Sequence, residues 1–338
     1  MAYLVVFTIG LALLFDFLNG MNDAANSIAT VVSTRVLSPR NAVIWAAFFN
    51  FVAAFVFGVH VANTIGKGIV NPMVITEVMI LSSLVGAIVW THFCTKFGMP
   101  ISVSHALIGG LAGAGVVKGG FEALVVGGIM KVVLFIFLSP LLGLLFGALL
   151  MILVSWLFGN MKVRSIDQGF RFGQLVSSAA FGLGHGTNDA QKTMGIIAIL
   201  LASSSVEFPR WFYDSSAGFY VPIWVILSAH AAIGLGTLAG GWKVIRTMGV
   251  NLTHLKPMGG FCAETAGATL LVGTAVAGIP VSTTHTIAGA IMGVGATRRL
   301  SAVRWGIAGK IIWAWILTIP VSALIGGLTY LIASQFHP

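Results

Sequence analysis

Two Asn-Asp pairs lie within long apolar stretches of this chain, Asn22-Asp23 and Asn188-Asp189. An Asp at the centre of a bilayer costs about 2.5–3.5 kcal/mol, so each carboxylate requires a partner or a ligand. Carboxylate, amide and freed backbone carbonyl oxygens are suitable ligands for a small cation or a proton. We therefore expect Asp23 and Asp189 to bind one, together with Asn26. The alternative is that each Asp only caps a helix that restarts after a break.

A second pair of motifs supplies hydrogen-bond donors, Pro100-Ile101-Ser102-Val103-Ser104-His105 and Pro280-Val281-Ser282-Thr283-Thr284-His285. Pro suits the first turn of a helix, and a nearby Ser can cap it. Such a helix N-terminus presents free N–H groups, hydroxyls and a positive dipole end, which together suit an oxyanion. A single hydroxyl would more often bond back to its own helix. The duplicated set favours a site for a tetrahedral oxyanion.

The candidate residues for binding this anion are Ser102, Val103, Ser104, Ser282, Thr283, Thr284, Asn22 and Asn188.

Both motifs recur in the same order, which indicates an internal duplication. Gly20–Ser27 matches Gly186–Thr193, and Gly98–His105 matches Gly278–His285. Glycines extend the second match at 109/289, 113/293 and 115/295. We expect residues 1–158 to form the first repeat and 159–338 the second. The glycines after His105 favour close helix packing over a phosphate-binding loop.

The composition restricts the chain to one class of protein. Of its 338 residues, 57% are hydrophobic and only 8% are charged, against about 25% charged in soluble domains. We predict an all-α polytopic membrane protein with two inverted repeats, broken helices, re-entrant hairpins and about 10–12 membrane segments. Breaks are expected at 19–23 and 184–189, and a division of the apolar stretch 123–158 near Ser139-Pro140.

The formal charge of +9 resides largely in short loops between apolar segments. This distribution is typical of cytoplasmic loops, so no nucleic acid is expected as a partner. Placing Arg35 and the loop 159–171 inside requires the segment 101–117 to dip in and return on the same side. If the segment 281–296 did likewise, Arg298 and Arg304 would lie outside, in conflict with the charge rule.

The second half differs from the first at two positions of the Asn-Asp motif. Lys192 stands where the first half has Asn26, and Gln191 where it has Ala25. We hypothesise that Lys192 is a fixed positive charge that replaces one bound cation and favours coupling to protons. The alternative is that it only neutralises Asp189.

Three further ionisable residues near these motifs are candidates for binding a proton, a cation or the anion. Glu264 precedes the second hydroxyl motif and could bind a proton or a cation. His105 and His285 could contact the anion, accept a proton or simply pack, and the sequence leaves their role open.

These motifs resemble those of the inorganic phosphate transporter (PiT) family, whose Gly-x-Asn-Asp-x-x-Asn element occurs in two inverted repeats. It appears here as Gly20–Asn26 and, altered, as Gly186–Lys192. The resemblance covers essentially the whole chain and is to a short bacterial member. It implies secondary active phosphate uptake across a bacterial inner membrane, driven by a sodium or proton gradient. It also implies that the Asn-Asp and Ser/Thr elements hold phosphate and cation, with sodium at Asp23, Asn26 and Asp189.

We therefore expect a phosphate symporter that works by alternating access, without an organic cofactor. A sulfate transporter of the same fold, a carrier of metal–phosphate complexes and an anion channel are the alternatives. No complete nucleophile–base set or zinc motif occurs in the sequence, so we expect no enzyme. A homodimer and a cytoplasmic regulatory protein are further partners that the sequence leaves open.

Overall fold

The computed structural model describes residues 2–56, 58–62, 68–214, 219–279 and 281–336. Pro280 of the second hydroxyl motif lies outside these ranges. The α-helices are α1 (Ala2–Ser33), α2 (Pro39–Val52), α4 (Glu77–Phe97), α5 (Val103–Gly119), α6 (Val126–Phe158), α7 (Val163–Ser203), α8 (Ile223–Ala239), α9 (Trp242–Arg246), α10 (Pro257–Val276), α11 (Thr283–Arg298) and α12 (Trp305–Ala333). Short helical turns are η1 (Ala53–Phe55), η2 (Pro72–Val74), η3 (Phe121–Ala123), the π-helical η5 (Thr247–Asn251) and η6 (Leu300–Ala302).

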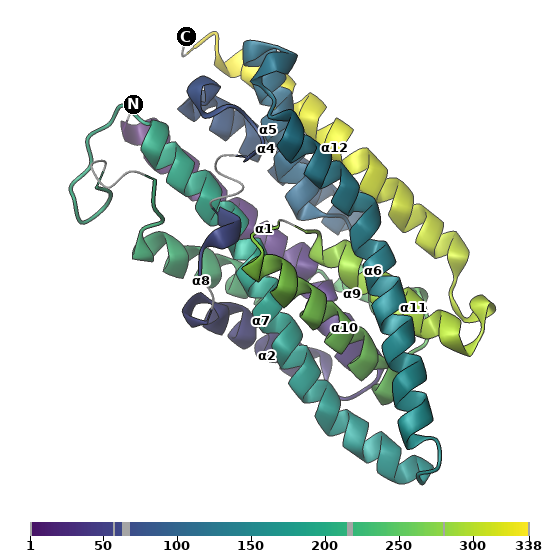
Figure 1. Ribbon diagram of the computed structural model, residues 1–338. Helices are drawn as coiled ribbons and strands as arrows, with labels where there is room; N and C mark the ends of the chain where they lie inside the picture. Colours follow the sequence, from purple (N-terminus) through teal and green to yellow (C-terminus); the bar gives the residue numbers. More distant parts are fainter. Residues whose placement is uncertain (1, 57, 63–67, 215–218, 280, 337–338) are drawn as a thin grey trace.

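The all-helical membrane architecture expected from the sequence is confirmed. Four described helices, α1, α4, α6 and α12, are each long and apolar enough to cross a membrane. A fifth candidate is α8 together with Trp242–Asn251, which are bent by 66° at the break between them. The long helices run side by side, and both chain ends lie at the same end of the bundle (Figure 1). Shorter or more polar helices, among them α5, α7 and α11, complete the bundle.

Two helical hairpins enter the bundle from opposite ends and meet inside it. One consists of α4 and α5, and the other consists of α10 and α11. At the meeting point, Thr284 Oγ1 donates to the carbonyl of Ile101 at 3.0 Å. The rings of His105 and His285 lie 4.9 Å apart. The two predicted helix N-termini therefore face each other in the interior.

Each hairpin packs against the last long helix of the opposite half. Helix α5 packs on α12, and α11 packs on α6. Glycine makes both contacts possible, because a Cβ on Gly113 would lie 2.0 Å from the carbonyl oxygen of Ala323. A Cβ on Gly293 would lie 2.1 Å from that of Leu144. The expected role of the repeated glycines in close helix packing is thus present in both halves.

The expected helix breaks are wrong. Helices α1 and α7 run continuously through 19–23 and 184–189, and α6 continues through Pro140. The motif glycines serve close approach instead: a Cβ on Gly20 would lie 2.1 Å from the carbonyl oxygen of Ile233 in α8. A Cβ on Gly186 would lie 2.5 Å from that of Asn50 in α2. Other helices therefore supply the polar partners that we had expected from unwound backbone.

The structure removes the conflict over Arg298 and Arg304. Helix α11 ends beside the start of α7, where Arg298 and Arg164 line one pocket. Arg171 of α7 in turn donates to the backbone carbonyl of Arg35 at 3.0 Å. These basic residues therefore share one end of the bundle, which we call the basic end (Arg35, Arg164, Lys256, Arg298 and Arg304). We expected the segments 101–117 and 281–296 each to enter the membrane and return on the same side. Instead, each is one helix of a two-helix hairpin, α5 with α4 and α11 with α10.

The glycine contacts lead to a stability prediction. Gly113→Ala should lower the stability of the detergent-solubilised protein by about 1–3 kcal/mol, because the added methyl overlaps backbone of α12. The measurement is the midpoint of thermal unfolding. Gly10→Ala in α1 is the matched control, since nothing lies within 4 Å of its added Cβ. Equal midpoints for the two variants would contradict the packing argument.

Candidate functional site

The two hairpin tips present helix N-termini to one another. Ser102 Oγ accepts from the backbone N–H of His105 at 3.2 Å, and Ser282 Oγ accepts from that of His285 at 3.2 Å. Both serines thus cap the following helix, and each keeps a hydroxyl proton to donate. The first N–H groups of α5 and α11, at Val103 and Thr283, have no partner within their helices. Together the tips carry donors and positive dipole ends in one place.

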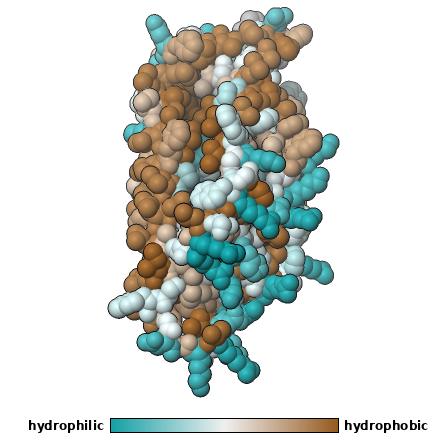
Figure 2. All heavy atoms as spheres, turned by 90° about the vertical axis from the view of Figure 1, so that its right-hand side faces the viewer, coloured by the Kyte–Doolittle hydropathy of each residue, from teal (hydrophilic) through white to brown (hydrophobic). Residues whose placement is uncertain are grey.

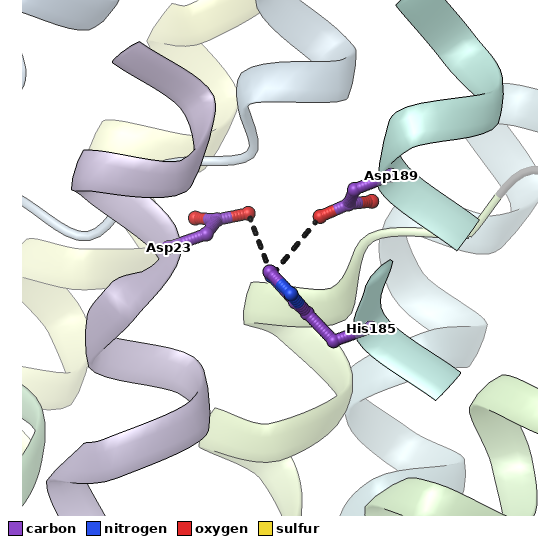
Figure 3. Close-up of side chains that lie close together, drawn as sticks. All are labelled: Asp23, His185 and Asp189. Atoms are coloured by element: carbon purple, nitrogen blue, oxygen red, sulfur yellow. Dashed lines mark ion pairs between the residues drawn. The ribbon is translucent and has the colours of Figure 1, made fainter. Parts of the chain in front are cut away.

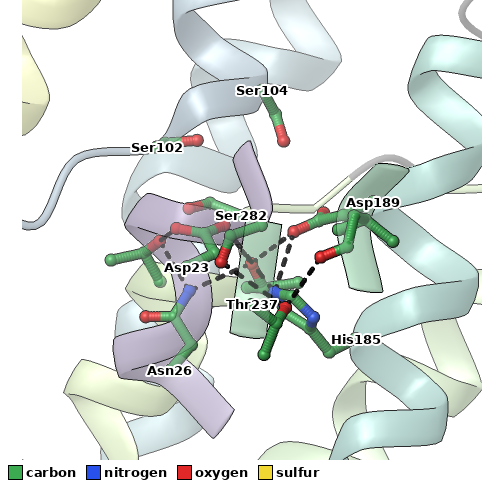
Figure 4. A network of polar contacts seen from close by, with 12 residues as sticks. Asp23, Asn26, Ser102, Ser104, His185, Asp189, Thr237 and Ser282 are labelled. Atoms are coloured by element: carbon green, nitrogen blue, oxygen red, sulfur yellow. Dashed lines mark hydrogen bonds and ion pairs between the residues drawn. The ribbon is translucent and has the colours of Figure 1, made fainter. Parts of the chain in front are cut away.

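Two carboxylates from the long helices lie beside these tips (Figure 4). Thr283 Oγ1 is 3.2 Å from Asp23 Oδ2 and 3.0 Å from Asp189 Oδ2. Thr284 Oγ1 is 3.1 Å from Asp23 Oδ1, and Asn26 Nδ2 donates to it at 2.9 Å. All five side chains are buried. We refer to Asp23, Asn26, Asp189, Thr283 and Thr284 as the carboxylate cluster.

The carboxylate cluster has too few protons for its acceptors. Each threonine hydroxyl has one proton, yet Thr283 faces both carboxylates, and Thr284 faces Asp23 as well as the carbonyl of Ile101. Two anionic carboxylates that share these donors repel each other in a region of low dielectric. The arrangement is therefore suited to binding a proton or another cation.

Lys192 joins α7 to both hairpin tips. Its ammonium group forms an ion pair with Asp189 and donates to the hydroxyl of Ser104 in α5. It also donates to the backbone carbonyl of Val281, just before α11, at 3.1 Å. The side chain is only 2% exposed. An ammonium group has three N–H donors, and here each of them has one acceptor.

His185 belongs to this site, although it was not among the residues predicted from the sequence. Its Nε2 lies 3.3 Å from Asp189 Oδ2 and 3.8 Å from Asp23 Oδ2, so that the three side chains point toward one another (Figure 3). Their ligand atoms all lie within 4.8 Å of one another, close enough to share one cation. The missed signal was spacing, because His185 lies four residues before Asp189 and hence on the same helix face.

A second contact of the imidazole fixes its orientation. Its Nδ1 is 3.1 Å from Asn50 Oδ1, and the amide nitrogen of Asn50 donates to Thr237 at 2.9 Å. This places the amide oxygen toward the ring. The other nitrogen, Nε2, faces the two carboxylates.

Comparison with known proteins places this chain in a family. The model of the Phosphate transporter family matches residues 19–326. The chain belongs to the Phosphate transporter family. It is 54% identical to a probable low-affinity inorganic phosphate transporter of Rhizobium meliloti (strain 1021), over 98% of this chain and 96% of that one. It is 40% identical to a protein of the same description from Bacillus subtilis (strain 168), over 96% and 95% of the chains.

A solved structure is similar over nearly the full length. "The sodium-dependent phosphate transporter" superposes with a TM-score of 0.89 at 26% identity, covering 98% of this chain and 99% of that one. The resemblance inferred from the two motifs is thus confirmed at the level of family and fold. A phosphate transporter family is not a class of enzymes.

Two residues expected at the site of this family member have partners elsewhere. The amide oxygen of Gln191 accepts from the backbone N–H of Val61 at 2.7 Å, and its nitrogen donates to the carbonyl of Gly58 at 2.6 Å. Gln191 therefore tethers the segment after η1. The amide nitrogen of Asn22 donates to Thr95 in α4 at 2.7 Å. By contrast, both amide atoms of buried Asn188 have no hydrogen-bond partner among the described residues, which leaves them available to a ligand.

Glu264 lies in a separate buried cluster. Ser177 Oγ donates to its carboxylate at 2.5 Å and Gln174 Nε2 at 3.0 Å. Gln174 accepts from Thr34, which directly follows α1, at 2.9 Å. This group links α10, α7 and α1, and none of its members belongs to the carboxylate cluster. A role for Glu264 in coupling stays a prediction.

The two motif histidines pack together behind the hairpin tips. The ring of His285 stacks on Trp315 with centroids 3.9 Å apart, and its Nδ1 lies 3.3 Å from the carbonyl of Ile136. Trp315 Nε1 donates to the carbonyl of Pro100 at 3.0 Å. His105 contacts His285 edge to face. These contacts favour a packing role that holds the two tips together.

Proposed function

We propose that this chain is a secondary active transporter that takes up inorganic phosphate together with a cation. The observation that carries the proposal is the meeting of two helix N-termini beside a pair of buried carboxylates. The hydroxyls of Ser104, Thr283 and Thr284 and the free N–H groups near them are donors suited to the oxygens of a tetrahedral anion. The other candidate ligands are Ser102, Val103, Ser282, Asn22 and Asn188.

The charge of the site makes a coupling cation necessary. Asp23 and Asp189 carry two negative charges, and Lys192 offsets one of them. A phosphate anion that enters adds at least one more negative charge at a buried position. Because like charges so close together are mutually destabilising, the anion binds well only when a cation binds with it. This mutual requirement is a coupling mechanism, which an anion channel would not need.

We further propose that the cation is a proton. Lys192 stands where the first half has Asn26, so an ammonium group occupies the place of a potential oxygen ligand for sodium. Its three contacts, to Asp189, Ser104 and Val281, support a permanent role for the charge. His185 Nε2 lies between the two carboxylates, where a proton can be shared among the three groups. Coupling to sodium is the alternative, since the structural neighbour is described as sodium-dependent.

Alternating access follows from the arrangement of the two halves in this proposal. Residues 1–158 and 159–338 are the inverted repeats, and each hairpin opens to one end of the bundle. Movement of one hairpin tip away from the other would expose the anion to that end alone. We assign the basic end to the cytoplasm by its excess of arginine and lysine, and the protein to the plasma membrane of a bacterium.

Uptake of radiolabelled phosphate into proteoliposomes tests the function. Proton and sodium gradients are imposed separately, and sulfate is added as a competitor. Uptake driven by the proton gradient alone, unaffected by sulfate, is the expected result. Transport of sulfate without phosphate would leave the fold in place and contradict the substrate. Phosphate flux that needs neither gradient and never accumulates would identify a channel.

A further inference from the structure

A polar pocket of about 480 Å³ opens at the basic end, away from the carboxylate cluster. It lies between the segment after η5 and the connection from α11 to α12. Its polar lining residues are Thr253, His254, Arg298, Arg299, Ser301 and Arg304. Three arginines line this one pocket, and guanidinium groups are suited to the oxygens of a phosphate group.

Hydrogen bonds hold the two walls of this pocket together. Thr253 Oγ1 donates to the carbonyl of Ala302 at 2.9 Å, and the backbone N–H of Arg304 donates to the carbonyl of Leu252 at 3.0 Å. The guanidinium of Arg298 also reaches the carbonyl of His254, at 3.5 Å. The pocket is therefore a defined part of the fold rather than a space between independent loops.

The arginines of the pocket lack acidic partners in the part of the chain that the structure describes. No described Asp or Glu lies within ion-pair distance of Arg298, Arg299 or Arg304. The nearby Asp167 is paired with Arg171 at 2.8 Å. Orientation in the membrane explains why basic residues gather at this end, but it does not explain why three of them surround one pocket.

An apolar groove adjoins the polar pocket. It has a volume of about 710 Å³ and lies between α6, α7, α10 and α11. His254 and Arg298 line both cavities, so the groove and the pocket are adjacent. The apolar wall includes Met151, Val163, Met258 and Val294, with Arg164 and Lys256 at its edge. A free phosphate ion would use only the polar pocket, whereas a phospholipid would use both.

The surface around these cavities matches a membrane boundary. Figure 2 shows hydrophilic side chains gathered over the lower half of the face where α11 joins α12, with apolar side chains above them. Trp305, which directly follows Arg304, is 49% exposed and donates its indole N–H to the carbonyl of Leu300 at 2.8 Å. Tryptophan and arginine together are typical of the level of lipid headgroups.

We infer that this pocket and groove bind an anionic phospholipid. The phosphate of the headgroup contacts Arg298, Arg299 and Arg304, and one acyl chain lies along the groove. Basic pockets between membrane helices on the cytoplasmic side are suited to such headgroups. The site does not depend on the transport proposal, because it shares no residue with the carboxylate cluster.

Native mass spectrometry of the full chain in detergent, with added phosphatidylglycerol or phosphatidylethanolamine, tests the inference. We expect phosphatidylglycerol to remain bound preferentially. The double variant Arg298→Gln/Arg304→Gln should weaken its binding about 25-fold, since each basic side chain near a lipid headgroup contributes about fivefold. Arg40→Gln/Lys162→Gln removes two exposed charges that line neither cavity, and it should bind phosphatidylglycerol as the parent chain does.

A second variant tests the groove without changing charge. Val163 is 80% exposed and lines the groove, so Val163→Trp should fill its mouth and weaken phosphatidylglycerol binding several-fold. Equal losses in the arginine variant and its control would overturn the inference in favour of general surface attraction. Displacement of the lipid by an equal concentration of inorganic phosphate would overturn it in favour of a site for the free ion. Unchanged binding by Val163→Trp would contradict the placement of the acyl chain.

Discussion

Phosphate uptake into proteoliposomes should fall about a hundredfold or more when Asp23 or Asp189 is replaced with Asn. Each change keeps the shape of the side chain and removes a negative charge from the carboxylate cluster. Asp189→Asn also leaves buried Lys192 without its ion-pair partner. An unpaired buried charge costs about 3–5 kcal/mol, and a cost of that size on forming the loaded site corresponds to a factor of more than a hundred in uptake. Asp23→Asn removes the second carboxylate that faces His185 and so weakens cation binding.

Asp167→Asn is the matched control. Asp167 is 45% exposed and pairs with Arg171 at 2.8 Å on the first turns of α7. An exposed pair of this kind contributes at most about 1 kcal/mol, so uptake should stay close to that of the parent chain. Thermal unfolding of each variant separates loss of function from loss of fold. Gradient-driven accumulation by a well-folded Asp23→Asn variant would contradict a coupling role for this carboxylate.

The parts of this site that sequence could predict are those specified by local chemistry. A Ser three residues before His105, after a Pro, is a helix-cap pattern, and Ser102 and Ser282 cap their helices as expected. The duplication of the motif then indicated that two N-termini form one site. Burial of Asp23 and Asp189 followed from their position in apolar stretches. These inferences needed only the residues adjacent in sequence and the duplication of the motif.

The parts that sequence did not predict depend on contacts between distant segments. The small and polar residues at Gly20–Asp23 suggested a break, but whether a helix unwinds depends on what packs against it. Here the backbone of α8 lies so close to Gly20 that only glycine fits, and the helix continues. The packing of α5 on α12 and of α11 on α6 likewise depends on how the halves assemble. The spacing of His185 to Asp189 was a local signal that we missed, but the contact of its ring with Asn50 of α2 depends on how distant helices pack.

The ion preference should change when Lys192 is replaced with Asn, which recreates the residue of the first half at this position. Loss of the ammonium leaves Asp189 without its ion pair and exposes an acceptor at Ser104. A free cation must then supply the missing positive charge. We expect uptake driven by a proton gradient to fall about tenfold or more, and uptake by the same variant to become stimulated by sodium. Proteoliposomes with each gradient imposed separately provide the measurement.

Two controls distinguish a change of coupling from general damage. Lys192→Arg keeps the positive charge, so any activity that remains should depend on protons and not on sodium. Lys96→Asn removes an exposed lysine at the end of α4 and should leave both the rate and the ion dependence unchanged. If Lys192→Asn folded, transported phosphate and kept the ion dependence of the parent chain, Lys192 would only neutralise Asp189. The coupling ion would then have to be determined by Asp23, His185 and Asn26, which both variants leave in place.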